Sequence, residues 1–452
     1  MVIDFLKHNE LELSDIKGWW LALLLIATSV ALFWRPYYFF IHDDWRTLAF
    51  MVGEPLYQYL LHTEGEQWVP FFHLAFYGLV RIFGDHYGWL ILVTCLGTGL
   101  NSFLLYLIFR RHFDSAISLT LSLVYASSSV HFATATMAFY LCYILSLVFF
   151  LLALLLTDRY LRSPSSVSLL GIGMLSLLSI LSHNYTVLAL PSLPLYILLV
   201  GEDASWRRFW SLVAVQLIVL VIFAIGYLDF AGLRATASIN HNIFSNFSPL
   251  GFIAHWFLGS FIFPFFYLVF NCSLKFVFQL IIGMVSFSLL LVTIYCWGNT
   301  QEKRFALWAL LFNGLPFLLV SFARCHFVMR QAFSERYGVF TLVGALLLAG
   351  TALGILARRL PRGRWFHLYL LLGVLALIIN GQLLHTSGVQ RLYKERSRIA
   401  KTTYEFYEEY SPMNKQTIEE ASRSFLIPDY PFLTEGQIVA IRQFLRGRPA
   451  GQ

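Results

Sequence analysis

Charged residues are scarce in this 452-residue chain, where Lys, Arg, Asp and Glu together make up only 13% of the sequence. A soluble domain usually carries about 25% charged residues. The chain therefore has too few charges to cover a water-facing surface of its size. Hydrophobic residues make up 58% of it. This composition excludes an ordinary soluble fold and indicates a protein that is embedded in lipid.

Paired cysteines and a leader sequence are also lacking. The five cysteines show no spacing typical of a disulfide framework or a zinc site. The start of the chain, residues 1–17, is charged and has no short apolar core, so we expect no cleavable signal peptide. The net charge of +7 does not indicate nucleic acid, because Lys and Arg are spread over short loops between apolar segments.

Long apolar runs are abundant, and they set the predicted fold class. A spanning helix needs roughly 20 apolar residues, and backbone polar groups in lipid must be paired within the segment. We therefore predict an all-α, polytopic transmembrane bundle of about eleven spans, with 10 to 13 as the range. The predicted spans are residues 18–40, 88–109, 114–130, 137–157, 167–182, 185–200, 207–228, 276–297, 305–322, 337–357 and 365–384.

The loops between these runs predict the orientation, because cytoplasmic loops collect Lys and Arg. The basic loops are those around Lys17, Arg110–His112, Asp158–Arg162, Arg207–Arg208, Lys303–Arg304 and Arg358–Arg364. We therefore place the N-terminus in the cytoplasm. The non-cytoplasmic face, which is periplasmic, extracellular or lumenal, then holds segments 41–87, 229–275 and 323–336 of a membrane domain over residues 1–384. The polar tail, residues 385–452, is expected on the same face.

Two further apolar stretches are expected to lie in the interface rather than to span. Residues 71–83 are too short to cross and read as an interfacial helix. Residues 251–270 are long enough to span, which would invert every later element. We place them in the interface, with Pro264 interrupting the helix.

An acidic pair directly follows the first apolar run, in the sequence His42-Asp43-Asp44-Trp45. Ionisable groups near the membrane are costly and usually functional. A carboxylate there can act as a general base, and two together can hold a divalent cation. The alternative is that one Asp caps the following helix. Both interpretations can hold, with one Asp capping and the other reacting.

Segment 323–336 adds three arginines, Arg324, Arg330 and Arg336, to a face that is otherwise poor in arginine. Guanidinium groups bind phosphate through forked, charge-assisted hydrogen bonds. The alternative is pairing with loop carboxylates or with anionic lipid. His131 lies on the same face and reads more readily as a satisfied polar anchor than as a ligand.

The order of these features resembles the GT-C class of membrane glycosyltransferases, and within it the protein O-mannosyltransferase and TMTC-like branch. Four stretches carry the resemblance. They are Asp43-Asp44-Trp45, the run Gln67–Leu74 with its Pro70, the stretch Tyr125–His131 followed by a long apolar helix, and Ser334-Glu335-Arg336-Tyr337. The resemblance covers most of residues 20–350.

This resemblance implies a polyisoprenyl-phosphate sugar donor, a reaction on the non-cytoplasmic face, and a glycan, lipid or protein acceptor. It implies Asp43 as the first choice for the base and Asp44 as the second. Arg336 is the first choice for the donor phosphate, ahead of Arg330 and Arg324. Further donor-site candidates are His42, Glu335, Tyr337 and His131.

One departure from the family concerns the turn over residues 131–136, which carries no carboxylate where relatives often have one. Either His131 substitutes for it, or the acceptor and the metal requirement differ. A divalent cation on Asp43 and Asp44 is therefore left open. Two other functions also remain open: a lipid or glycan flippase, and a scaffold that has kept the fold without activity. The polar groups cluster at one face, which disfavours a transport pathway through the membrane.

Overall fold

The computed structural model describes most of the chain and shows it to be helical. The described residues are 16–35, 38–40, 43–64, 67–201, 206–230, 247–269, 275–324, 335–359, 370, 374–375, 394–395, 397–398, 401 and 435–446. The predicted span 365–384 and most of the tail lie outside this set. The only ladder among the described residues pairs two residues of β1 (Thr63–Glu64) with two of β2 (Gln67–Trp68), in antiparallel register.

The helices follow in chain order. The first group is α2 (Ile16–Phe33), α3 (Asp43–Gly53), α4 (Leu56–Leu61), α5 (Pro70–Phe83), α6 (Tyr87–Phe109), α7 (Ser115–Ser127), α8 (His131–Thr136), the short 3-10 helix η1 (Ala138–Tyr140) and α9 (Leu141–Arg162). The second is α10 (Ser166–Ser182), the 3-10 helix η2 (Asn184–Ala189), α11 (Ser192–Val200), α12 (Trp206–Phe230), α14 (Pro249–Phe257), the π-helix η4 (Leu258–Ile262), α15 (Phe263–Val269), α16 (Phe276–Trp297), α17 (Thr300–Arg324), α18 (Glu335–Arg359) and α21 (Glu435–Leu445).

Seven of these helical stretches are long and apolar enough to cross a membrane. They are Tyr87–Phe109, Ala138–Arg162, Trp206–Phe230, Pro249–Tyr267, Phe276–Trp297, Thr300–Phe322 and Tyr337–Arg359. Several predicted spans are shorter than expected. The first ends at Phe33 rather than at residue 40, and the stretch 185–200 is divided into η2 and α11. The protein is a polytopic helical membrane protein, as its composition predicts.

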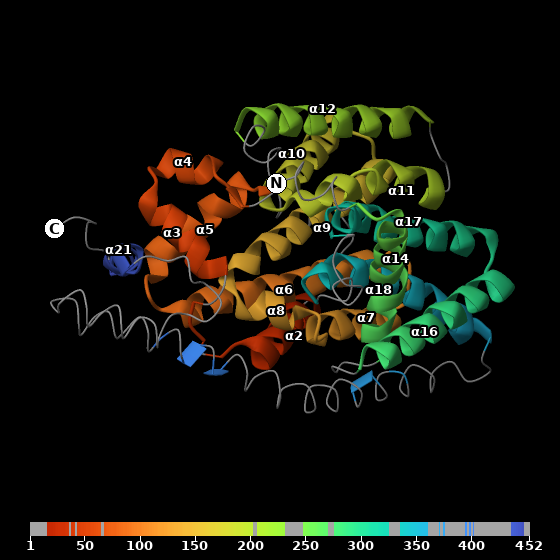
Figure 1. Cartoon of the computed structure of the whole chain (residues 1–452). Helices are drawn as coiled ribbons and strands as arrows, with labels where there is room; N and C mark the ends of the chain where they lie inside the picture. Colours follow the sequence, from red (N-terminus) through yellow and green to blue (C-terminus); the bar gives the residue numbers. More distant parts are fainter. Residues whose placement is uncertain are drawn as a thin grey trace.

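The interruption predicted at Pro264 is wrong. The helix that begins at Pro249 continues through η4 and α15 to Val269. One π turn directly precedes the proline, and such a turn shifts the hydrogen-bond ladder inside a helix without ending it. Figure 1 shows α14 running across the direction of α12 rather than along it.

The ends of several helices meet at one end of the bundle, which we call the basic end. Arg358 of α18 pairs with Glu302 of α17, and Arg359 lies over the ring of Trp297 at the end of α16, 5.9 Å from its centroid. Arg208 of α12 donates to the carbonyl of Leu161 in α9. Because α12 begins and α16 ends at the basic end, the other ends of these two helices, at Phe230 and Phe276, lie away from it.

The opposite end, which we call the Asp43 end, holds α3, α4 and α5 together with α21 from the tail (Figure 1). In α21, Ile441 is fully buried and Leu445 nearly so. The guanidinium carbon of Arg81 in α5 lies 5.2 Å from the ring centroid of Phe444. The tail helix α21 thus packs on the elements that surround Asp43.

Close helix contacts depend on glycine at two positions. A Cβ on Gly99 of α6 would overlap the backbone of Ile26 in α2, so these helices approach backbone to backbone. A Cβ on Gly226 of α12 would overlap the ring of Trp68. The side-chain amide of Asn184 spans the backbone of Trp68, 2.8 Å from its oxygen and 3.1 Å from its nitrogen, with the amide assigned so that both bonds form.

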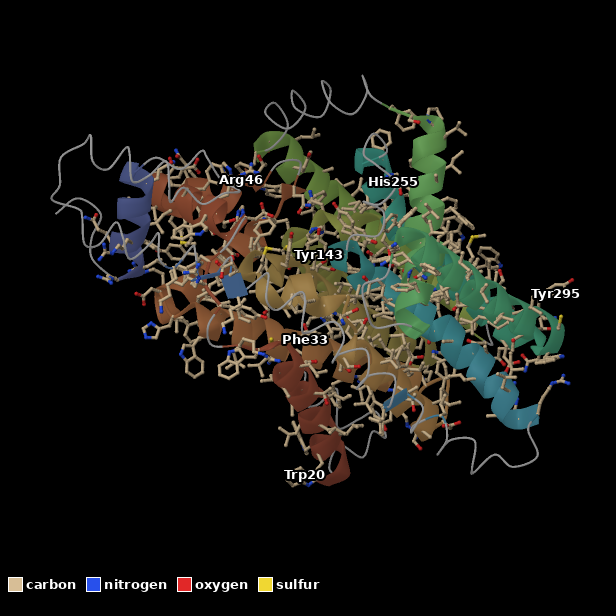
Figure 2. The ribbon with its side chains drawn as sticks, turned by 60° about the horizontal axis from the view of Figure 1, so that its bottom comes forward. Trp20, Phe33, Arg46, Tyr143, His255 and Tyr295 are labelled. Carbon is tan, nitrogen blue, oxygen red and sulfur yellow. The ribbon has the colours of Figure 1, made fainter. Side chains whose placement is uncertain are left out.

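The outside of the bundle carries exposed apolar and aromatic side chains, as expected where lipid is the solvent. Trp20 lies at the free end of α2 and Tyr295 near the end of α16, and both are mostly exposed (Figure 2). Lys303 lies over the ring of Tyr295, 5.2 Å from its centroid. Aromatic and basic side chains near helix ends are typical of the membrane interface.

Candidate active site

Asp44 is held inside the protein by two hydrogen bonds. The hydroxyl of Tyr87 donates to Asp44 Oδ2 at 2.5 Å, and the backbone N–H of Phe139 donates to Oδ1 at 2.7 Å. The same Tyr87 oxygen accepts from the N–H of Ala138 at 3.0 Å. Asp44 is fully buried. Asp44 therefore joins α3 to α6 and to η1. Because its carboxylate is fully buried, this role is structural.

Asp43, by contrast, is partly exposed at the first residue of α3. Its backbone carbonyl accepts from the hydroxyl of Thr47 at 3.0 Å, which fixes the first turn. Trp45 is buried and donates from Nε1 to the carbonyl of Phe40 at 2.8 Å. Because Asp44 and Trp45 are both buried, Asp43 is the carboxylate of the pair that is partly exposed.

The start of α18 packs on the same connecting segment as Asp44. A Cβ on Gly338 would overlap the side chain of Val130, next to α8, and would also crowd Phe263. Tyr337 is buried, with its ring edge-on to Phe317 at a centroid distance of 6.2 Å. Residues 130–140 thus contact Asp44 through Phe139 and the first turn of α18 through Val130, which places that turn at the Asp43 end.

The remaining arginine candidates are placed less completely. Arg324 is the last residue of α17, and Glu335 and Arg336 open α18. Their side chains, and all of His42 and Arg330, lie outside the described part of the structure. The predicted phosphate contacts of these residues therefore stay predictions.

His131 is fully buried at the start of α8, between α7 and η1. Its ring packs on Tyr125 and Phe33, at centroid distances of 4.5 and 6.2 Å. Burial lowers the pKa of His131 to about 3, and the backbone of Tyr125 offsets only part of that shift. The imidazole is therefore neutral at physiological pH and gives no positive charge to a phosphate.

A divalent cation does not find a ligand set among the described residues. They contain no group of three or more His, Cys, Asp or Glu side chains that could hold a metal ion. Each oxygen of Asp44 already accepts a hydrogen bond from the protein. Hard cations need six or more oxygen ligands, several of them from protein or substrate. We therefore derive no step through a metal.

A cavity of about 430 Å³ opens beyond the other end of α3. Its walls include Glu54, Tyr57, His62 and the end of α12 at Phe230. Glu54 and His62 are 3.4 Å apart and pair with each other. Because α3 has 11 residues and rises about 1.5 Å per residue, this cavity lies roughly 16 Å from Asp43 and does not adjoin it.

The architecture is shared with known proteins. Residues 68–227, less than half of the chain, match the model of a family described as dolichyl-phosphate-mannose-protein mannosyltransferase. The structure aligns with the archaeal oligosaccharyltransferase AglB from Archaeoglobus fulgidus, solved with an inhibitory peptide and a dolichol-phosphate, at a TM-score of 0.50 and 13% identity. That alignment covers 95% of this chain and 64% of AglB. This chain has a GT-C-like fold.

A second structure of an A. fulgidus oligosaccharyltransferase, tethered to an acceptor peptide, aligns at a TM-score of 0.47 and 13% identity, over 96% of this chain and 63% of that one. The chain thus spans less than two thirds of the length of the solved relatives that it matches. None of the curated protein sequences matches it. Within the GT-C-like fold, the acidic pair and α18 lie outside the segment that matches the family model.

Sequence reasoning identified Asp43 and Asp44 but missed Tyr87 and η1, which decide which of the two is buried. Tyr87 is an ordinary polar residue at the start of a span, and Phe139 takes part only through its backbone. No side-chain pattern marks a backbone donor, so the sequence held no signal for this contact.

Proposed function

We propose that this chain is a glycosyltransferase that moves a sugar from a polyisoprenyl-phosphate carrier to an acceptor on the non-cytoplasmic face of the membrane. One observation carries the proposal: in a GT-C-like fold, the partly exposed Asp43 lies at the same end as the first turn of α18, with residues 130–140 between them. The matched family and the AglB structure both name a dolichyl- or dolichol-phosphate, which supports this donor class.

In the proposed reaction, Asp43 accepts the proton of the acceptor hydroxyl as that oxygen bonds to the anomeric carbon. The bond from the anomeric carbon to the phosphate oxygen breaks at the same time, and the carrier leaves as its phosphate. Arg336, with Arg330 and Arg324, would stabilise the charge that develops on that phosphate. A single displacement of this kind inverts the anomeric centre. Asp44 positions Asp43 through its bonds to Tyr87 and Phe139.

The proposed acceptor is a glycan, a lipid or a protein. The orientation follows the positive-inside rule, which puts the basic end in the cytoplasm and the Asp43 end outside. Arg111, Arg162, Arg208 and Arg358 all lie at the basic end.

The test is a proteoliposome assay with a polyprenyl-phosphate sugar that carries a label in the sugar. A transferase releases the carrier phosphate and moves the label to an added acceptor fraction. A flippase moves the labelled donor between leaflets and leaves it intact, and a scaffold does neither. Release of the carrier phosphate in liposomes that contain the protein, and not in empty liposomes, supports the proposal. Translocation of the intact donor without release contradicts it.

A further inference from the structure

A cavity of about 520 Å³ opens at the basic end, far from the acidic pair. Its walls are the turn between α6 and α7, the ends of α11 and α18, and the turn between α16 and α17. The polar wall residues that matter are Arg111, His112, Asp114, Glu302 and Arg358. The assignment of this cavity does not depend on the proposed function.

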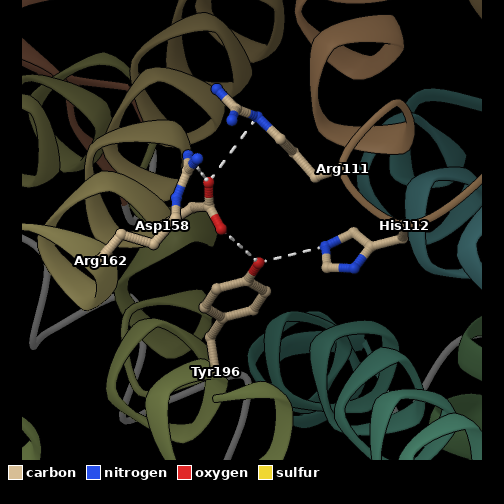
Figure 3. Close-up of polar contacts among 5 residues, drawn as sticks. All are labelled: Arg111, His112, Asp158, Arg162 and Tyr196. Carbon is tan, nitrogen blue, oxygen red and sulfur yellow. Dashed lines mark hydrogen bonds and ion pairs between the residues drawn. The ribbon is translucent and has the colours of Figure 1, made fainter. Parts of the chain in front are cut away.

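Arg111 and His112 of the cavity lining belong to a network of five side chains (Figure 3). Asp158 of α9 accepts from Arg162 at 2.6 Å and from the hydroxyl of Tyr196 in α11 at 3.1 Å. The Tyr196 oxygen lies 3.1 Å from Nε2 of His112. Because the only hydroxyl proton of Tyr196 points to Asp158, His112 must donate from Nε2.

His112 therefore lends this wall no charge. Burial lowers the pKa of His112 to about 4, with Asp158 raising it and Arg111 lowering it by smaller amounts. The ring is neutral at physiological pH, and its Nε2–H is already used. The positive charge on the cavity wall comes from the arginines.

Arg111 is the member of the network with unused donors. Its Nε lies 3.7 Å from Asp158 Oδ2, which is too long for a hydrogen bond. Within the described part of the chain its guanidinium makes no hydrogen bond, and its Nε is buried without a partner. The side chain is only 17% exposed. A mostly buried guanidinium whose donors lack a hydrogen-bond acceptor needs one, because unsatisfied charged donors are costly.

The carboxylates on the wall do not supply that acceptor. Asp114 caps α7 by accepting from the N–H of Ile117 at 2.9 Å. Glu302 accepts from the N–H of Asn299 at 2.9 Å and pairs with Arg358. Another lining residue, Gly354 of α18, faces open space: a Cβ added there would meet nothing within 4 Å, whereas one on Gly350 would overlap Phe113.

The lining also includes the polar side chains of Asn299, Gln301 and Thr351 and the apolar side chains of Ile117, Val200 and Phe305. The cavity thus combines a guanidinium and other polar groups with an apolar part of its wall, at the ends of spanning helices, the depth at which lipid headgroups lie. A phosphate supplies two or more oxygens in the geometry that a guanidinium fork bonds best. A free anion would contact the guanidinium but not the apolar side chains. A lipid would contact both, with its phosphate on the guanidinium and its chains on the apolar side chains.

We propose that this cavity binds the phosphate group of a membrane lipid, with Arg111 as its principal ligand and the apolar wall against the lipid's glycerol and upper chain. The lipid phosphate accepts hydrogen bonds from the Arg111 guanidinium. It also joins the turn between α6 and α7 to the end of α11, the start of α17 and the end of α18.

The experiment uses the full chain, delipidated in a neutral detergent, and measures its unfolding temperature while phosphatidylglycerol is added. Two further titrations use diacylglycerol, which has no phosphate, and inorganic phosphate, which has no chains. Wild type is expected to gain stability with phosphatidylglycerol in a saturable way and to respond to neither of the others in the same concentration range. Equal half-saturation with inorganic phosphate would overturn the lipid assignment.

Three variants locate the site. Arg111→Gln is expected to weaken the apparent affinity about tenfold, the usual effect of removing hydrogen bonds to a charged group. Gly354→Leu fills the open space, so it should abolish the response and leave the unfolding temperature without lipid no lower. Arg110→Gln is the matched control, because Arg110 is an exposed neighbour outside the cavity lining, and it should respond like wild type.

Two site variants are used so that the test still gives a result if one of them does not fold. If Arg111→Gln fails to fold, Gly354→Leu still decides, because its effect is steric and does not remove a native contact. A wild-type response in Gly354→Leu, or in a folded Arg111→Gln, would show that lipid binds elsewhere and would contradict the proposal.

Discussion

Asp44 and Tyr87 lie 43 residues apart in the chain, yet their side chains meet at 2.5 Å in the interior of the protein. The hydroxyl of Tyr87 also accepts a backbone hydrogen bond from Ala138, so one phenol links three segments. This contact distinguishes Asp44, a buried carboxylate that holds the structure, from Asp43, which is partly exposed.

Removing either partner of this contact should therefore cost stability. Tyr87→Phe removes the hydrogen bond to Asp44 Oδ2 and the one that the Ala138 N–H donates to the phenol, and Asp44→Asn weakens both bonds to the carboxylate. We expect each to lower the free energy of unfolding by about 1–3 kcal/mol, measured by thermal unfolding of the purified chain. Asp43→Asn, at a partly exposed position, serves as the control and should stay within about 0.5 kcal/mol of wild type. Wild-type stability in Asp44→Asn would contradict the assignment.

Acid should destabilise the protein through its buried histidines. The pKa of His131 falls to about 3 in the folded state, against about 6.5 for a histidine in water. Between these two values the unfolded chain binds more protons, so folding stability is complete above about pH 6.5 and is lost as the pH falls. His131 contributes up to about 1.4 kcal/mol per pH unit in this window.

Thermal unfolding at pH values from 7 to 4.5 measures this slope. His131→Phe keeps an aromatic ring against Tyr125 and Phe33 but cannot titrate, so its slope should be shallower than that of wild type. A residual slope is expected, because burial also lowers the pKa of His73, in α5, and of His112, at the basic end, each to about 4. Identical slopes for the variant and wild type would show that His131 is solvated in the folded protein.

The tail helix α21 should stabilise the segment that carries Asp43. Ile441 is fully buried against that segment, and removing a large core side chain costs about 2–5 kcal/mol. We expect Ile441→Asp to lower the unfolding temperature and to make the tail sensitive to protease. Arg446→Gln is the control, since the ion pair of Arg446 with Asp85 is partly exposed and 3.9 Å long, and its loss should change little. Equal protease resistance in both variants would argue against packing of α21 on this segment.

Gly226 should be intolerant of any side chain. A methyl group there would overlap the ring of Trp68, which stacks on Phe230 at a centroid distance of 5.9 Å. We expect Gly226→Ala to cost about 1–3 kcal/mol through overpacking. Gly78→Ala in α5 is the matched control, because its Cβ meets nothing within 4 Å and alanine favours a helix, so it should be neutral or slightly stabilising. Thermal unfolding of the pair checks the prediction, and equal stabilities would contradict it.

Much of this architecture could be predicted from the sequence, because lipid leaves the chain few choices. Apolar length alone predicted the helices α6, α12, α16 and α18 to within a few residues. Pro70 at the first position of α5 is the start signal expected for the helix predicted at 71–83. The π turn before Pro264 could not be predicted, because it depends on how the surrounding helices accommodate one missing N–H.

The candidate site was harder to predict than the helices. Adjacency of Asp43 and Asp44 marked the position, but their different burial depends on contacts with Tyr87 and Phe139, which lie 43 and 95 residues away from Asp44. At the basic end, Arg111 and Asp158 were interpreted only as topology signals. Their network with His112 and Tyr196 joins α9 and α11 to the turn between α6 and α7 and leaves no local pattern in the chain.

The most direct test of the central claim compares Asp43→Asn with wild type in the transfer assay, under single-turnover conditions and at matched unfolding temperature. Glu54→Gln, just beyond the other end of α3, controls for loss of a carboxylate in the same segment. If Asp43 is the base, the asparagine variant should transfer the labelled sugar at least about 100-fold more slowly, while Glu54→Gln transfers at close to the wild-type rate. Transfer by Asp43→Asn at the wild-type rate would show that Asp43 takes no part in the chemistry.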